Sequence, residues 1–173
     1  MSSHYGNRIV VDTGPLLVHA AGVFDKGRTS KPHLKKATSN LRITEDDAEH
    51  FSEVLDRVFS SAREIIITPY VLAELCNLAS HRLKLKNERL EEFISSYKEF
   101  LLKLRECNVA KKDIIDFKDS WKFCFTDASL ALISRRKGMT LITTDFILAN
   151  WCKKHNIDAR DAYNDIYLSA PRP

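Results

Sequence analysis

Two patterns of apolar residues alternate along the chain. Short runs rich in β-branched residues occupy positions 8–11, 65–67 and 140–144, and a weaker run lies at 157–162. Runs of this length predict buried strands of a parallel sheet, with 157–162 at its edge. Between them, apolar residues recur with the period of an α-helix. Because strands and helices alternate, the chain is predicted to be an α/β protein, a three-layer α/β/α sandwich around a central parallel sheet.

The predicted helices begin and end at residues that suit those positions. Thr44 precedes three acids, which favour a helix N-terminus, and Pro69 suits the first position of a helix. Gly138 suits a helix end. Residues 109–117 fit either a short strand or a turn of helix. Helices are predicted over residues 16–21, 45–59, 69–79, 91–104, 126–137 and 146–154.

One segment breaks this alternation. Gly22 to Asn40 holds five lysines or arginines against one acid, Asp25, with glycine, serine and proline between them. Such a composition predicts an exposed loop, so we expect a single domain over residues 1–173 with a basic loop insertion around 22–44. Basic residues here and in a second basic stretch are candidates for RNA phosphate contacts, although such residues are commonly just solvated. They are Lys31, Lys35, Lys36, Arg82, Lys84 and Lys86.

Composition limits the class of protein. The 173 residues carry a net charge of +4, which mildly favours an acidic partner such as nucleic acid but is ordinary for a soluble domain. No two of the four cysteines form a CxxC pair, and none has a histidine at zinc-finger spacing, so we expect small core residues in a reducing compartment. No apolar run reaches the length of a signal peptide core or a membrane span. A cytoplasmic protein without a membrane partner is therefore expected.

Four acids occur in segments that are otherwise rich in apolar residues. Asp12 and Asp145 each end a predicted strand, Asp127 lies in the first turn of a predicted helix, and Glu74 lies one turn into another. Strand ends and the helix starts that follow them lie on one side of a parallel sheet, so the four carboxylates should converge there. Each acid alone has a structural explanation, as a turn residue or as a partner of a helix dipole. Their shared placement favours a functional site.

Carboxylates gathered at one edge repel one another, and a bound cation removes that cost. Oxygen ligands suit Mg²⁺ or Mn²⁺, and no set of histidines or cysteines competes for zinc. Two such ions about 4 Å apart can activate a water and stabilise the leaving oxygen of a phosphodiester. Asp127 is a candidate to orient the water instead. Three polar residues are weaker candidates to assist the acids, with a structural role left open for each: Thr13, Asn77 and Thr143.

Four short motifs together resemble the PIN-domain nuclease family. They are Val10-Val11-Asp12-Thr13, Thr68-Pro69-Tyr70-Val71-Leu72-Ala73-Glu74-Leu75, Phe125-Thr126-Asp127-Ala128 and Leu141-Ile142-Thr143-Thr144-Asp145, and they occur in the family's order. The resemblance implies a PIN-like fold and a Mg²⁺- or Mn²⁺-dependent endoribonuclease that cleaves single-stranded RNA. It assigns the catalytic and metal-binding roles to Asp12, Glu74, Asp127 and Asp145.

Many nucleases of this family are toxins of toxin–antitoxin pairs. The resemblance therefore also implies an antitoxin protein as a partner, and it leaves a homodimer open. The chain departs from the small toxins in its overall length and in the longer stretch between Asp12 and Glu74. These departures concern the toxin role more than the chemistry.

Other functions remain open. A catalytically silent PIN-like module that binds RNA or protein would keep the same fold and acids. A phosphatase with Asp12 as nucleophile is less favoured, because such sites use a second acid two residues later, where this chain has Gly14. The aromatic residues Trp121, Phe123 and Phe125 are able to stack on bases, but core packing is the favoured use.

Overall fold

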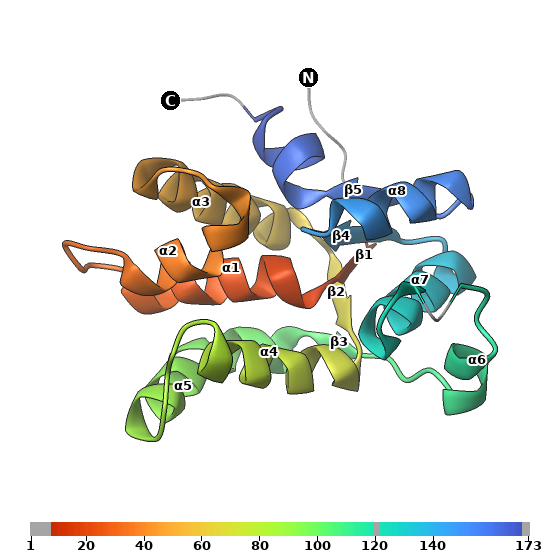
Figure 1. The fold of residues 1–173 in the computed structure, drawn as a ribbon, viewed down its shortest axis with the longest axis horizontal. Helices are drawn as coiled ribbons and strands as arrows, with labels where there is room; N and C mark the ends of the chain where they lie inside the picture. The colour runs from red at the N-terminus through yellow and green to blue at the C-terminus, as the bar shows by residue number, and fades with distance from the viewer. Residues whose placement is uncertain (1–7, 120–121, 171–173) are drawn as a thin grey trace.

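The centre of the protein is a five-stranded sheet, seen in a computed structural model that describes residues 8–119 and 122–170 (Figure 1). Every neighbouring pair of strands is parallel, and the strand order is β3-β2-β1-β4-β5. The strands are β1 (Arg8–Val11), β2 (Glu64–Ile67), β3 (Arg105–Glu106), β4 (Thr140–Thr143) and β5 (Ala159–Asp161). The central position of β1 explains why Ile9, Val10 and Val11 are fully buried.

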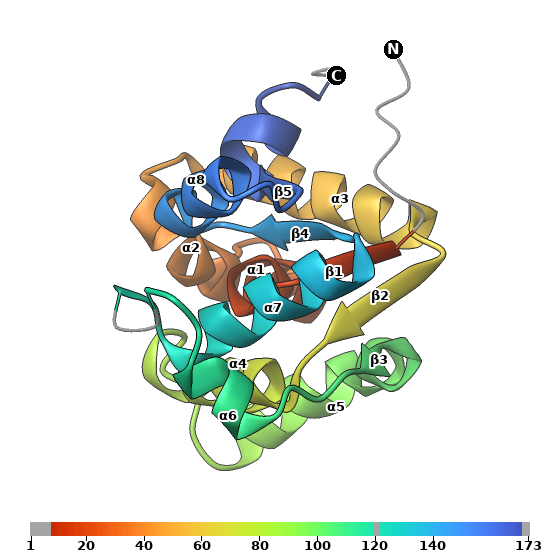
Figure 2. The same ribbon diagram turned by 90° about the vertical axis from the view of Figure 1, so that its right-hand side faces the viewer.

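Helices cover both faces of the sheet. They are α1 (Thr13–Asp25), α2 (Pro32–Ala37), α3 (Glu45–Ser61), α4 (Pro69–His81), α5 (Glu88–Lys103), α6 (Lys111–Ile115), α7 (Phe125–Lys137) and α8 (Phe146–Lys154), with a 3₁₀ turn over Ser39–Leu41 and a π-helical turn over Ala162–Tyr167. Figure 2 shows α7 on the near side of β1 and β4, with α3 on the far side. The predicted α/β/α sandwich with a central parallel sheet is confirmed.

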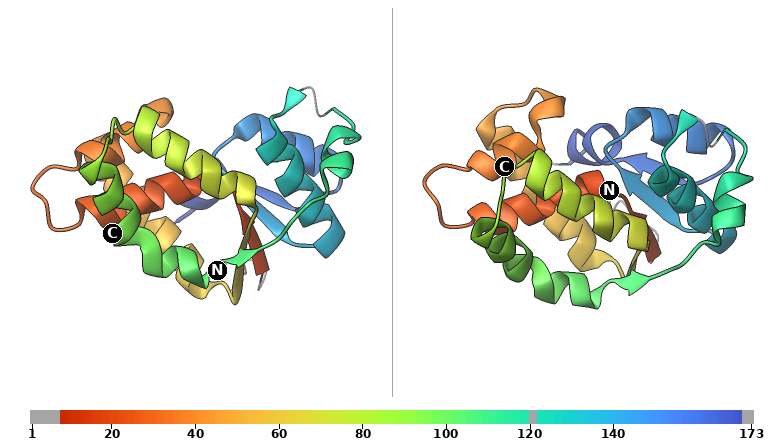
Figure 3. Two further views of the ribbon diagram at one scale, coloured as in Figure 1. Left: turned by 90° about the horizontal axis from the view of Figure 1, so that it is seen from below. Right: turned by 60° about the horizontal axis from the view of Figure 1, so that its bottom comes forward.

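Two groups of helices lie on either side of β1. Figure 3 shows α1, α4 and α5 together on one side, while α7 and α8 lie on the other. The helix ends mostly follow the predicted signals: Thr44 caps α3 by accepting a hydrogen bond from the Asp47 N–H, and Gly138 ends α7 with a positive φ of 59°. Pro69 is the first residue of α4, as predicted. The described helices include none that is both long and apolar enough to cross a membrane.

The predicted basic loop around residues 22–44 is wrong for most of its length. Helix α1 continues to Asp25, and α2 and the 3₁₀ turn follow. Asp25 is fully buried, and its carboxylate accepts hydrogen bonds from the backbone N–H groups of His33 (2.8 Å) and Leu34 (3.0 Å). The His33 ring nitrogen Nδ1 lies 2.6 Å from the same carboxylate. The one acid of a basic segment therefore ties α1 to α2, which a count of charges does not reveal.

Replacing Asp25 is expected to destabilise the protein. Asp25→Ala leaves two backbone N–H groups and the His33 ring without their buried acceptor, so the free energy of unfolding should fall by about 2–4 kcal/mol. Urea unfolding followed by circular dichroism measures the loss. The control is Asp116→Ala, at an exposed acid, where a change of about 0.5 kcal/mol or less is expected. Equal losses for both variants would show that Asp25 does not organise this turn.

Several local predictions were also wrong. The two-residue strand β3 was not predicted, because both of its residues are charged and exposed. The predicted strand over 157–162 shortens to β5, whereas residues 111–115 form a helix, one of the two forms predicted for 109–117. Of the four cysteines, which were all predicted in the core, only Cys152 is buried; Cys107 is half-buried, and Cys76 and Cys124 are exposed.

Candidate active site

Asp12 and Asp145 follow neighbouring strands of the sheet. Val11, the last residue of β1, pairs with Ile142 of β4, and the Asp12 N–H continues this ladder by donating to the Ile142 carbonyl at 2.9 Å. Asp12 then caps α1, and Asp145 caps α8. The parallel register of β1 and β4 therefore places both acids at the carboxyl edge of the sheet, where α/β proteins bind their ligands.

A close approach of two turns holds these acids beside each other. A Cβ atom on Gly14 would lie 2.0 Å from the hydroxyl of Thr144, closer than any real contact. Glycine at this position therefore lets the turn after β1 pack directly against the turn after β4. The same packing explains why position 14 carries no second acid, as a phosphatase of the kind considered above would require.

Hydrogen bonds through two threonines connect three of the four acids. The Thr143 hydroxyl donates to Asp12 Oδ2 (2.6 Å) and accepts from the backbone N–H of Asp145 (2.9 Å). The other oxygen of Asp12 accepts from the Thr13 N–H at 2.6 Å, and the Thr13 hydroxyl donates to Glu74 Oε2 at 2.9 Å. Thr13 and Thr143 are both buried. Their hydroxyl groups therefore orient the carboxylates of Glu74 and Asp12 from the protein interior.

Asp12 is a buried carboxylate that is difficult to ionise. It is 7% exposed, and burial raises its pKa to about 7, with smaller contributions from the negative charges of Asp127 and Glu74. The hydrogen bonds from Thr143 and Thr13 act in the opposite direction. Burial outweighs them because an isolated carboxylate loses much of its hydration there.

The fourth acid, Asp127, lies within the electrostatic field of the other three. Burial raises the pKa of Asp127, and the charges of Asp145 and Glu74 raise it further; Asp127 in turn raises the pKa of Asp12. Two of the acids also have local roles. Asp145 Oδ1 accepts from two N–H groups of the first turn of α8, and Asp127 Oδ2 makes a long contact of 3.4 Å with the Cys124 N–H.

Within the described part of the chain, no basic side chain neutralises these acids. Among residues 8–119 and 122–170, no lysine, arginine or histidine forms an ion pair with any of the four. The same residues contain no three acid, histidine or cysteine side chains already arranged to hold a metal ion. Mg²⁺ commonly uses one or two carboxylates and completes its shell with water and phosphate, so this donor set fits such an ion.

Two of the basic residues predicted to contact RNA are engaged in contacts within the chain. Lys31 is occupied within the chain, because its ammonium group pairs with Glu49 (3.4 Å) and donates to a backbone carbonyl. Lys36 donates to the Leu83 carbonyl at 3.0 Å, which places α2 beside the connector between α4 and α5. Lys35, Lys84 and Lys86 are exposed and Arg82 is half-buried; together with Lys36, these residues of α2 and the connector are called the basic surface.

The basic surface lies away from the acids. Arg82 follows Glu74 by eight positions along α4, a rise of about 12 Å. Asn77, also on α4, is exposed, and the described part of the chain gives it no hydrogen bond to an acid. The predicted supporting role of Asn77 thus has no contact behind it, in contrast to those of Thr13 and Thr143.

The aromatic residues considered for base stacking differ in their exposure. Phe123 packs edge-on against Trp151, with ring centroids 5.4 Å apart, as core packing predicts. Phe125 does not, because it is 60% exposed. Trp121 lies outside the described residues.

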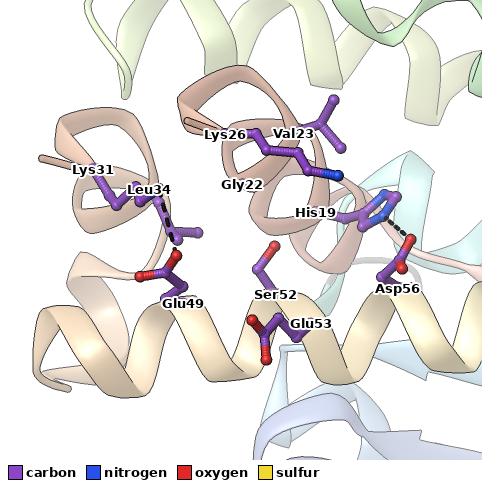
Figure 4. A pocket seen from close by; sticks show the side chains of 10 residues that line it. All are labelled: His19, Gly22, Val23, Lys26, Lys31, Leu34, Glu49, Ser52, Glu53 and Asp56. Atoms are coloured by element: carbon purple, nitrogen blue, oxygen red, sulfur yellow. Dashed lines mark hydrogen bonds and ion pairs between the residues drawn. The ribbon is translucent and has the colours of Figure 1, made fainter. Parts of the chain in front are cut away.

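A pocket of about 250 Å³ between α1, α2 and α3 is separate from the acids (Figure 4). Gly22, in its lining, follows Asp12 by ten positions, or about 15 Å along α1. On its floor, His19 contacts Asp56 (3.1 Å) and the Tyr97 hydroxyl (2.6 Å), and burial lowers the pKa of the His19 ring. The sequence does not indicate these contacts, because Asp56 and Tyr97 are remote from His19 in the chain.

Comparisons with known proteins leave the family open. A scan against protein-family models gives no match, and a search of the curated proteins finds none either. The resemblance to PIN-domain nucleases therefore stays a prediction from the four sequence motifs.

Proposed function

We propose that the protein is a Mg²⁺- or Mn²⁺-dependent endoribonuclease that hydrolyses phosphodiester bonds of single-stranded RNA. One observation carries the proposal: four mutually repelling carboxylates share the carboxyl edge of the sheet, and no basic side chain of the described chain pairs with them. A cluster of this kind destabilises the protein unless a cation joins it or a proton neutralises part of its charge. The choice of RNA as the substrate rests on the resemblance to PIN-domain nucleases.

The surroundings of the four acids suit them to different roles, metal binding or proton acceptance. Asp12, Glu74 and Asp145 would hold one or two divalent ions, which supply Lewis-acid stabilisation of the charge that develops on the phosphate. Thr13 and Thr143 fix the orientation of the Asp12 and Glu74 carboxylates through their hydroxyl groups. Asp127, whose pKa is raised, is suited to accept a proton from the attacking water.

The partners follow from the same proposal. The basic surface would attract the RNA backbone at a distance from the acids, since lysine and arginine bind phosphates. An antitoxin protein and a second copy of the chain are further proposed partners, drawn from the resemblance alone. The proposed compartment is the cytoplasm, where thiols stay reduced; all four cysteines are free.

A second candidate is a catalytically silent module that binds RNA or a protein. It is favoured by the engagement of Asp145 and Asp127 in capping contacts and by the lack of a preformed metal cage among the described residues. This module would need the fold and the capping contacts of the acids, but not their charge.

Two measurements separate the candidates. Purified protein is incubated with single-stranded RNAs in Mn²⁺, in Mg²⁺ and in EDTA, and the product ends are identified; the nuclease is expected to leave 5′-phosphates only when metal is present. Crystals soaked in Mn²⁺ should show anomalous density between Asp12 and Asp145. If several RNAs stay intact in Mn²⁺ and no ion appears at the acids, the silent module is the better description.

Thr143 offers a test of carboxylate positioning. Thr143→Val removes the donor to Asp12 and the acceptor for the Asp145 N–H, so kcat/KM should fall about 10- to 100-fold. The pKa of Asp12 should rise further, which moves the acidic limb of the pH–rate profile upward. Thr143→Ser keeps the hydroxyl and should retain most activity with an unshifted profile. A serine variant as impaired as the valine variant would point to packing instead.

A further inference from the structure

Three large apolar side chains are exposed beside the acids. Phe125 is 60% exposed, Phe146 59% and Ile147 70%. Phe125 is the first residue of α7, and Phe146 and Ile147 are the first two residues of α8. Exposed apolar side chains that gather around a polar site are typical of an interaction surface.

Local packing does not require these rings to face solvent. Other apolar residues of the same helices are buried, as Leu130 and Leu148 are. Phe123, only two positions before Phe125, packs against Trp151. Within residues 8–119 and 122–170, neither Phe125 nor Phe146 has an aromatic partner. Their exposure is therefore a property of the first turns of α7 and α8.

Both rings are close to an acid along the chain. Phe125 precedes Asp127 by two positions, and Phe146 follows Asp145 directly. Helix α7 packs against β1 and β4, and α8 begins directly after the short turn that follows β4. The charge of Asp145 also acts on Asp127. The two first turns thus border the same stretch of the carboxyl edge, with an exposed phenyl ring on each.

Binding of a nucleic acid at this edge faces an electrostatic obstacle. The acids repel the phosphates, and a divalent cation offsets that repulsion only at the phosphate it contacts. Arg82 of the basic surface lies about 12 Å beyond Glu74 by helical rise, so it is not next to the phosphate held at the acids. Stacking of a base on an aromatic ring does not depend on charge, and it tolerates any base. Phenyl rings beside the acids supply this kind of contact.

We propose that Phe125 and Phe146 form a stacking platform for the bases on either side of the phosphate held at the acids. The inference rests on the proposed nuclease function and specifies its substrate. A base stacks on a protein ring only when it has left its own helix, so the platform selects single-stranded over double-stranded RNA. Ile147 extends the apolar border next to Phe146.

The test combines protein and RNA changes. Phe125→Leu and Phe146→Leu keep an apolar side chain and remove the flat ring, whereas the corresponding tyrosine variants keep the ring. Leu102→Ala is the control, because Leu102 is 75% exposed on α5, outside this site. The substrate is a short single-stranded RNA of fixed sequence that wild type cuts at one bond. Matched substrates carry an abasic ribose on either side of that bond.

Each leucine variant is expected to raise KM about 10-fold with little change in kcat, while the tyrosine and Leu102→Ala variants stay near wild type. An abasic ribose should raise KM by a similar factor for wild type. In the leucine variant that lacks the ring facing that position, the abasic ribose should raise KM almost no further. This loss of additivity is the signature of a direct base–ring contact. Fully additive effects would overturn the platform even if the enzyme cleaves RNA.

Failure of the platform and failure of the nuclease give different results. If wild type binds the labelled RNA by fluorescence anisotropy in Mn²⁺ without cutting it, the proposed activity fails. The platform is then judged by the same variants on binding alone. If wild type neither cuts nor binds the RNA, the platform is overturned. If the leucine variants leave RNA binding unchanged but reduce self-association in sedimentation experiments, the two rings belong to a protein interface instead.

Discussion

Asp12→Asn is expected to abolish metal-dependent RNA cleavage, with kcat/KM lowered by about 10³-fold or more. Asp12 sits at the centre of the site, because it is hydrogen-bonded to Thr13 and Thr143 and coupled by charge to Glu74 and Asp127. An amide has nearly the same shape and keeps an acceptor oxygen, so the fold should remain. Loss of the negative charge removes the ligand that a divalent ion prefers, which costs several kcal/mol of transition-state stabilisation.

The control for this experiment is a charge change of the same kind elsewhere. Asp116→Asn removes an exposed carboxylate on the surface and should leave kcat/KM within about twofold of wild type. Asp145→Asn should resemble Asp12→Asn, because both acids border the proposed ion. Circular dichroism must show that all three variants are folded. An Asp12→Asn enzyme with near wild-type cleavage would remove Asp12 from the catalytic mechanism.

The stability of the metal-free protein is expected to fall as pH rises. The pKa of Asp12 is about 7 in the folded protein and 3.8 for an unperturbed group, so the folded state holds the proton more tightly. The contribution of Asp12 to stability is therefore most favourable below about pH 4 and is lost as pH rises through 7. Between pH 5 and pH 8 this carboxyl group alone should reduce the free energy of unfolding by about 2–3 kcal/mol. Asp127, whose pKa is also raised, acts in the same direction.

Comparison with Asp12→Asn isolates this effect from the other titrating groups. In EDTA at pH 8 the variant should be more stable than wild type, and the difference should shrink at pH 5. Mn²⁺ should reverse the order at pH 8, because an ion that binds only the folded wild type stabilises it. Urea unfolding at the two pH values, with and without Mn²⁺, gives four free energies of unfolding for each protein. If the free energies of unfolding of wild type and variant show the same pH dependence in EDTA, burial does not raise the pKa of Asp12.

Short-range patterns were sufficient for most of the fold. The strands at residues 8–11, 65–67 and 140–143 and the helix starts at Thr44 and Pro69 came from runs of apolar residues and from end residues, whose physics is local. The parallel sheet followed from the alternation of strands and helices. Where the pattern was weak, prediction failed. β3 has two charged, exposed residues, and it is a strand only because Ile66 and Ile67 of β2 offer it their open edge.

The sequence by itself determined the α/β architecture and the placement of four acids, two at strand ends and two near the starts of helices, because both depend on neighbours a few residues away. Only the tertiary structure decided which polar groups meet. Thr143 reaches Asp12 across 131 positions, and buried Asp25 organises a segment whose composition indicated a loop. It also decided that Phe125 and Phe146 face solvent. Such contacts depend on the register of strands and on the packing of helices, and local sequence encodes neither.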